Sequence, residues 1–133
     1  GIWSTKQGYP RYNLAKPKYL SLTYPVIDLS LKKGVTRANC LGENYSEEEV
    51  KKYSVHTNVD ENYPETYLWQ GRNDQCISFE NSVIMDKALT ENNVKHKYVV
   101  YDDTCHGFGA GKGTCAEGWI DDMLRFFNEN NKE

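Results

Sequence analysis

Hydrophobic and polar positions divide the middle of the chain into two short β-prone runs and one helical stretch. The runs over 66–70 (TYLWQ) and 97–101 (KYVVY) are short and rich in aromatic and β-branched residues, which predicts strands. Over 79–92, apolar residues recur at positions 79, 83, 84, 88 and 89, the spacing of a helix with one buried face. A strand, a helix and a second strand over about 35 residues form a βαβ unit. The pattern therefore predicts two parallel strands joined by a crossover helix.

Two further elements are expected before this unit. The run over 19–26 (YLSLTYPV) is apolar and β-prone and predicts a strand, whereas 27–45 is expected to be a long irregular connection. Ser46 and Glu49 then match a capping box, which predicts a short helix to about Tyr53 and another loop after it.

The C-terminal part of the chain is expected to be helical. Thr114 and Glu117 match a second capping box, which predicts a helix start. The helix would place these apolar residues on one face: Trp119, Ile120, Met123, Leu124 and Phe127. Residues 1–18 are polar, contain glycine and proline, and predict a fraying helix end and a loop. The whole pattern predicts an α/β fold in three layers with at least three strands, and no internal repeat indicates a second domain.

Composition and charge exclude several classes of protein. The 133 residues fit one domain, and 38% hydrophobic with 13% aromatic residues are sufficient for a core. The formal net charge of -3 argues against a nucleic-acid partner, and no apolar run approaches the roughly 20 residues of a membrane helix. The chain begins without Met or a secretory signal pattern, so we expect a cut chain from a cytoplasmic protein.

The four cysteines show neither a metal-binding nor a disulfide-framework spacing. No CxxC pair is present, so no metal and no cofactor are expected. We interpret the cysteines mostly as free thiols. Cys105 and Cys115 flank a glycine-rich loop and would be able to bridge it in a secreted protein.

Candidate chemistry lies in the loops that follow two of the predicted strands. Asp74 follows the run 66–70, and His106 follows the run 97–101. The carboxyl ends of parallel strands share one edge of a sheet, where ligands bind, so the two side chains can meet there. A carboxylate beside an imidazole selects the imidazole tautomer and stabilises the imidazolium, as in a nucleophilic triad. The alternative interpretation is structural: Asp74 as a turn former and His106 as an ordinary loop residue.

Four segments in chain order resemble the acetylxylan-esterase-like α/β hydrolases, which are related to prolyl oligopeptidase and dienelactone hydrolase. They are the strand end Tyr24-Pro25-Val26-Ile27, the acid segment Leu68 to Ile77 (LWQGRNDQCI), the helix start Glu80-Asn81-Ser82 and the histidine segment His106-Gly107-Phe108-Gly109. The resemblance implies the C-terminal part of an α/β-hydrolase, with parallel strands and helices on both faces. It also implies that Asp74 and His106 are the acid and base of a Ser-His-Asp esterase. Tyr45 and Tyr53 would lie where family members cover the active site, so they are loose candidates for substrate contact.

The serine nucleophile of that family has no counterpart in this sequence. Its G-x-S-x-G turn is absent, and none of the serines has the flanking glycines. The resemblance places the nucleophile and the oxyanion hole before Gly1, so 1–133 is expected to be one partial domain, inactive alone as an esterase. Because half a sheet leaves a strand edge unpaired, we expect the chain to associate with its N-terminal half or with a second copy. The completed enzyme would hydrolyse small carboxylic esters, with acetyl groups on plant polysaccharide as the family-level expectation.

Two other functions remain open from the sequence. A degenerate hydrolase relative would act as a non-catalytic binding or interaction module. The stretch 107–114 (GFGAGKGT) resembles a phosphate-binding loop, but His106 stands where such a loop needs its first glycine, and Gly113 follows the lysine. A nucleotide partner is therefore the least favoured of the three interpretations.

Overall fold

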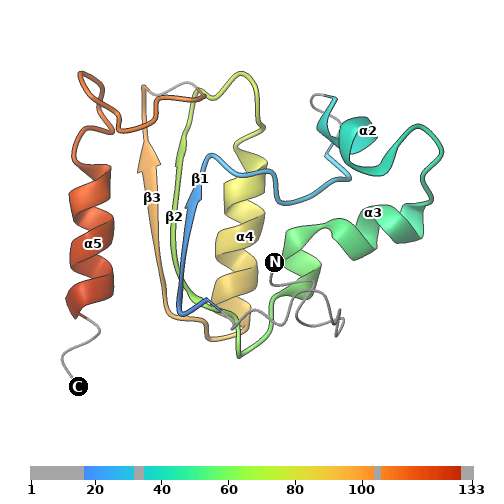
Figure 1. Ribbon diagram of the computed structural model, residues 1–133, viewed down its shortest axis with the longest axis horizontal. Coiled ribbons are helices and arrows are strands. Elements are labelled where there is room, and N and C mark those ends of the chain that lie inside the picture. Colours follow the sequence, from blue (N-terminus) through green and yellow to red (C-terminus); the bar gives the residue numbers. More distant parts are fainter. Residues whose placement is uncertain (1–16, 32–34, 104–105, 130–133) are drawn as a thin grey trace.

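The computed structural model describes residues 17–31, 35–103 and 106–129 and shows three parallel strands flanked by helices (Figure 1). The strands are β1 (Tyr19–Thr23), β2 (Glu65–Gly71) and β3 (His96–Tyr101), and β2 lies between the other two. Leu22 of β1 is paired with Leu68 of β2, which is paired with Tyr98 of β3. This topology confirms the predicted α/β class and the predicted βαβ unit.

Helices cover both faces of the sheet. Helix α4 (Glu80–Glu91) connects β2 to β3 and packs on one face, and α5 (Trp119–Glu129) packs on the other face (Figure 1). The connection between β1 and β2 contains α2 (Thr36–Leu41), α3 (Glu47–Tyr53) and the 3-10 helix η2 (Val55–Asn58). None of the helices in the described ranges is long and apolar enough to cross a bilayer.

Strand β2 supplies the core of both layers because its side chains alternate between the two faces. Leu68 faces α4 and packs in one cluster with Met85, whereas Tyr67 and Trp69 face α5 and pack with Phe127. All three β2 side chains are fully buried. This burial explains why Tyr67, Leu68 and Trp69 form an unbroken apolar run at the centre of the strand.

The first half of the chain departs from the predicted boundaries in two places. The expected irregular connection 27–45 is wrong over Thr36–Leu41, which form α2. The expected strand 19–26 ends at Thr23, because Tyr24 adopts a positive φ of 40° and Pro25 follows it. The predicted capping box is confirmed: Ser46 Oγ accepts from the Glu49 amide at 3.2 Å, and Glu49 Oε2 accepts from the Ser46 amide at 2.9 Å.

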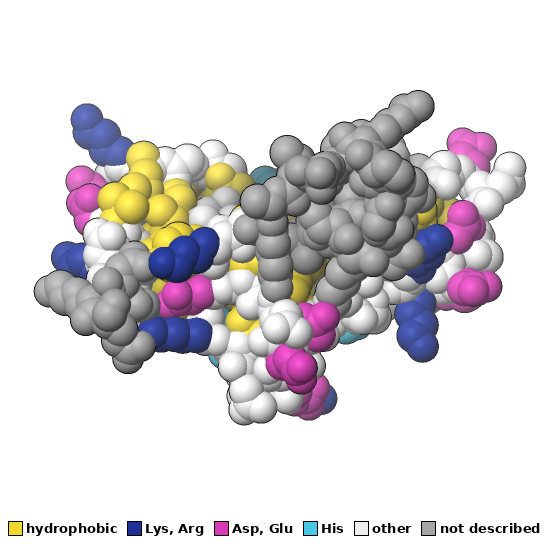
Figure 2. Space-filling view, turned by 60° about the horizontal axis from the view of Figure 1, so that its bottom comes forward, with side chains coloured by type: hydrophobic (Ala, Val, Ile, Leu, Met, Phe, Trp, Pro, Cys, Tyr) yellow, Lys and Arg dark blue, Asp and Glu magenta, His cyan; other side chains and the backbone are white. Residues whose placement is uncertain are grey.

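The second predicted capping box does not start a helix. Gly118 has φ +86°, which a right-handed helix cannot contain, so α5 begins at Trp119 and not after Thr114. The predicted apolar face is also only partly buried, because Ile120 and Leu124 remain 38% and 48% exposed. Figure 2 shows hydrophobic side chains gathered at the end of the molecule where α5 lies.

Part of the predicted chain lies outside the described residues. The loop expected over 1–18 falls almost entirely there, and so does Cys105. Cys40, Cys76 and Cys115 are exposed free thiols, as expected for most of the cysteines.

Candidate active site

The loop after β2 holds Asp74 in a tight hydrogen-bonded turn. The Asp74 amide donates to the carbonyl of Gly71 at 3.3 Å. Its carboxylate oxygen Oδ1 accepts from the amides of Cys76 and Ile77 at 2.8 and 2.9 Å. The Asp74 side chain is fully buried, so these bonds replace the water that it loses on folding.

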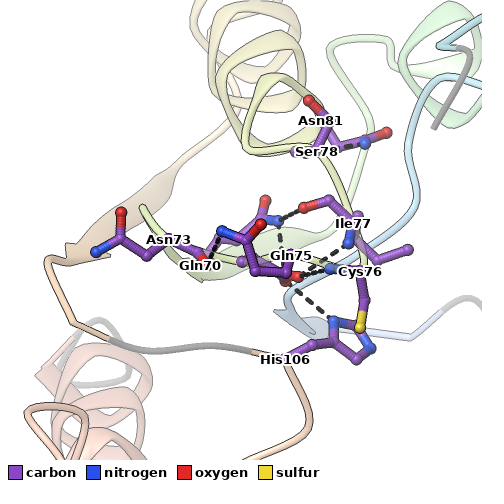
Figure 3. Close-up of polar contacts among 9 residues, drawn as sticks. Gln70, Asn73, Gln75, Cys76, Ile77, Ser78, Asn81 and His106 are labelled. Atoms are coloured by element: carbon purple, nitrogen blue, oxygen red, sulfur yellow. Dashed lines mark hydrogen bonds and ion pairs between the residues drawn. The ribbon is translucent and has the colours of Figure 1, made fainter. Parts of the chain in front are cut away.

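The loop after β3 brings His106 to the same carboxylate (Figure 3). His106 Nδ1 lies 3.0 Å from Asp74 Oδ2, and the imidazole remains 31% exposed. The two residues are 32 positions apart in the chain and meet because β2 and β3 are adjacent parallel strands. The predicted meeting of the two side chains is therefore observed.

Electrostatics favour an ionised Asp74. Burial raises the pKa of this carboxyl group, but the hydrogen bonds from Ile77, His106, Cys76 and Gln70 outweigh burial, and the net effect lowers the pKa from its ordinary value. Because a carboxylate only accepts hydrogen bonds, His106 must donate through Nδ1–H, which leaves the lone pair of the neutral ring on Nε2. Among the described residues, no group hydrogen-bonds this Nε2.

Gln70, at the end of β2, holds the loop that carries Asp74 through two side-chain hydrogen bonds. The side chain is fully buried, and its Nε2 donates to the Ile77 carbonyl at 3.0 Å and to Asp74 Oδ2 at 3.3 Å (Figure 3). These two bonds fix the Asp74 side chain relative to the Ile77 backbone. Gln70 also contacts the same Asp74 oxygen that accepts from His106. The sequence contains a signal for this role, since Gln70 is a polar residue at the end of an apolar strand.

Surface contacts also tie the loop after β2 to the loop after β3. The Arg72 amide donates to the Tyr101 carbonyl at 2.8 Å, and Asn73 Nδ2 donates to the Asp102 carbonyl at 2.8 Å. An ion pair joins Arg72 Nε to Asp102 Oδ1 at 3.2 Å, but both side chains are well exposed, so its contribution is small.

Comparison with known proteins identifies the family. Residues 18–133 match the prolyl oligopeptidase family. The chain belongs to this family. Among curated proteins, it is 29% identical over 108 residues to endo-1,4-beta-xylanase B of Butyrivibrio fibrisolvens, a match that covers 78% of this chain and 16% of that protein.

Solved structures extend the family assignment to the fold. An acetyl ester-xyloside bifunctional hydrolase from Caldicellulosiruptor lactoaceticus superposes with a TM-score of 0.79 at 26% identity, covering 86% of this chain and 43% of that chain. A carboxylesterase from Lactobacillus plantarum superposes with a TM-score of 0.75 at 18% identity, covering 94% and 49% of the two chains, and supports the fold. This prolyl oligopeptidase family chain therefore spans about half the length of these structures and is similar to xylan-esterase-like hydrolases and carboxylesterases.

Asn81, in the helix start Glu80-Asn81-Ser82 of this family member, makes hydrogen bonds to the chain that leaves β1. Its Oδ1 accepts from the amides of Ile27 and Asp28 at 2.8 and 3.0 Å, and its Nδ2 donates to the Ser78 carbonyl at 3.0 Å. One buried amide group thus ties the chain leaving β1 to the start of α4. Sequence spacing did not reveal this role, because the partners are more than 50 positions apart.

The loosely predicted substrate contacts lie in another part of the family fold. The guanidinium of Arg37 lies 5.0 Å from the Tyr45 ring centre, and Lys52 Nζ lies 5.6 Å from that of Tyr53. Tyr45 lies between α2 and α3, and Tyr53 is the last residue of α3. Neither tyrosine is in the loops that carry Asp74 and His106. Their contact with substrate stays a prediction.

Three other features of the described residues bear on function: metal-ligating side chains, the serines, and the stretch that resembles a phosphate loop. No three His, Cys, Asp or Glu side chains within 17–31, 35–103 and 106–129 are arranged to hold a metal ion. None of the serines in these ranges is hydrogen-bonded to His106. The stretch 107–114 is followed by turns, and α5 begins only at Trp119, so the helix N-terminus that a phosphate loop requires does not follow it directly.

Proposed function

We propose that Asp74 and His106 are the acid and base of a Ser-His-Asp carboxylic ester hydrolase. The observation that carries this proposal is the 3.0 Å contact of His106 Nδ1 with the ionised, buried carboxylate of Asp74. In this arrangement, Nε2 accepts the proton of a serine hydroxyl as its oxygen attacks the ester carbonyl. Asp74 stabilises the resulting imidazolium, which then returns the proton to the leaving alcohol. Water repeats the sequence and releases the acid from the acyl-enzyme.

The serine and the oxyanion hole are proposed to come from a polypeptide segment outside these 133 residues. The sequence contains no G-x-S-x-G turn, and no serine in the described ranges is bonded to His106. On this proposal the isolated chain does not hydrolyse esters, since acid and base without a nucleophile have no acyl transfer to perform.

Small carboxylic esters are the proposed substrates, with acetyl groups on plant polysaccharide as the natural class. The names of two similar proteins support this choice, one being a xylanase and the other an acetyl ester-xyloside hydrolase. Release of acetate from acetylated xylan, compared with hydrolysis of 4-nitrophenyl acetate and butyrate, tests the acyl group and the carrier separately.

The decisive experiment compares the isolated chain with the complete gene product that contains it. We expect hydrolysis of 4-nitrophenyl acetate by the complete product, and a loss of at least about 10³-fold in kcat for His106→Ala. His96→Ala is the matched control, because His96 Nε2 lies 3.0 Å from Asp86 in a similar pair at the other end of β3. Serine-esterase rates from the isolated chain, or full activity of His106→Ala, would refute the proposal. A complete product that lacks a G-x-S-x-G turn and does not hydrolyse esters would favour the binding-module alternative.

The edge of β1 is the proposed contact with the missing segment or with a second copy. Within 17–31, 35–103 and 106–129, β1 pairs with no strand other than β2, and its residues are half-buried or exposed. An unpaired strand edge recruits another strand. Sedimentation of the isolated chain should show association at micromolar concentration, and a well-behaved monomer would count against this contact.

A further inference from the structure

Tyr24 occupies an unusual backbone conformation directly beside the proposed acid–base pair. Its φ is +40°, in a region that bulky residues rarely adopt. The next residue is Pro25, whose ring favours an extended conformation in the residue before it. Such residues persist where the surroundings hold them, and they cluster at active sites. The conformation therefore requires an explanation from the contacts of this residue.

Those contacts anchor Tyr24 to β2 through its backbone and its ring. The Tyr24 amide donates to the Trp69 carbonyl at 2.9 Å, which continues the β1–β2 pairing by one residue. The Tyr24 ring meets the Trp69 ring edge-on, with centres 5.2 Å apart and planes at 88°. Trp69 is itself fully buried and packs against the rings of Tyr101 and Trp119. Tyr24 is thus braced against a rigid aromatic cluster.

The other neighbour of the Tyr24 ring is the imidazole of His106. The two ring centres are 4.6 Å apart, with planes at 62°. Among the described residues, the imidazole makes one hydrogen bond, from Nδ1 to Asp74. The hydrogen bond at Nδ1 and the covalent bond at Cγ restrain one side of the ring, but combined changes of χ1 and χ2 can still swing Nε2 on the far side. A second contact, against the ring itself, limits this swing and the direction of Nε2.

We propose that Tyr24 is a positioning residue that supplies this second contact and sets the direction of Nε2 in the acid–base pair. The inference rests on the proposed function for its catalytic meaning, but the orientation of the ring is a separate, measurable property. The positive φ turns the chain away from β1 and thereby carries the ring across Trp69 to His106. The ring, and not the hydroxyl, performs the role.

Three substitutions of Tyr24 separate the ring from the backbone, and a fourth substitution serves as a control. Tyr24→Phe keeps the ring and removes the hydroxyl. Tyr24→Leu removes the ring, and Tyr24→Asn removes it while supplying a residue that tolerates positive φ. Tyr19→Leu is the matched control, because Tyr19 lies at the opposite end of β1 and packs against Phe127 with ring centres 4.6 Å apart.

The first readout is the NMR signal of the His106 ring in the full chain, which requires no catalysis. Loss of the Tyr24 ring current shifts the ring protons by itself, so the linewidth of the Nδ1–H signal is the quantity compared. We expect Tyr24→Phe and Tyr19→Leu to leave this signal sharp, and Tyr24→Asn and Tyr24→Leu to broaden it. Backbone amide spectra verify that each variant is folded, and Tyr24→Asn serves if Tyr24→Leu does not fold. An Nδ1–H signal as sharp in folded Tyr24→Asn as in the parent would overturn the proposal.

The second readout is ester hydrolysis by the complete gene product. Loss of the ring should lower kcat by about 10- to 100-fold with KM little changed, because a misaimed base acts in the transition state and not in binding. Tyr24→Phe should stay within about twofold of the parent. Wild-type kcat in Tyr24→Asn would also overturn the proposal. A complete product without any hydrolysis, combined with the expected NMR changes, would instead refute the proposed function and leave the positioning role standing.

Discussion

Replacing Asn81 with alanine tests whether one buried amide holds the start of α4 to the chain leaving β1. The substitution removes the acceptor for the Ile27 and Asp28 amides and the donor to the Ser78 carbonyl. Ile27 is only 1% exposed, so water cannot easily replace its lost acceptor. A buried donor without a partner costs about 1–3 kcal/mol, and the two partly exposed groups add about 1 kcal/mol together. We therefore expect Asn81→Ala to lower the free energy of unfolding by about 3 kcal/mol.

Urea denaturation followed by circular dichroism measures this loss. For an m-value of about 2 kcal/mol/M, the midpoint should fall by about 1.5 M with the slope unchanged. Asn92→Ala is the matched control at the other end of α4, where a half-buried Nδ2 donates to the Ala88 carbonyl at 2.9 Å. That variant should lose about 1 kcal/mol or less. Equal losses in the two variants would refute the argument that burial of the Ile27 amide decides the cost.

Three further outcomes are expected. Because the folded pKa of Asp74 is lowered, its carboxylate stabilises the fold above the unfolded pKa, and this contribution is lost as the pH falls through the folded pKa. The stability difference between the parent and Asp74→Asn, from urea titrations, should therefore shrink below about pH 4, and a pH-independent difference would contradict the shift. Tyr67→Phe removes the hydroxyl that donates to Asp122 Oδ2 at 2.7 Å. The free energy of unfolding should fall by about 1–2 kcal/mol, measured in thermal melts. An unchanged melting temperature would show that the bond contributes nothing. Leu89→Ala opens a cavity at a fully buried position and should cost about 3 kcal/mol in chemical denaturation, and a loss below about 1 kcal/mol would show that the site collapses.

Elements that bury a face were predictable from the sequence, and elements that bury none were not. β2, α4 and β3 lie within one residue of their predicted bounds, because the strands are short β-prone runs and the helix carries a periodic apolar face. Helix α2 was missed because none of its residues is buried, so its sequence shows no apolar periodicity. The start of α5 was misplaced because the positive φ of Gly118 ends any helix that the capping pattern at Thr114 would start.

The same division applies to the candidate site. Asp74 and His106 were predictable as neighbours because topology alone brings loops after adjacent parallel strands together. The roles of Gln70 and Tyr24 depend on individual hydrogen bonds and ring contacts, whose partners spacing does not identify. Asn81 was visible as part of a family motif, but its partners became apparent only from the folded chain.

Because Asp74 and His106 lie within one βαβ unit, the length of the chain outside that unit does not affect the entropic cost of bringing them together. Closing a loop of about 32 residues costs about 3 kcal/mol in chain entropy, and the pairing of β2 with β3 already brings the loop ends together. The hydrogen bond between the two side chains therefore adds almost no closure cost of its own. Insertions between β1 and β2, where α2, α3 and η2 lie, lengthen no loop that the pair must close. That connection can change in length while the contact between acid and base keeps the same entropic cost.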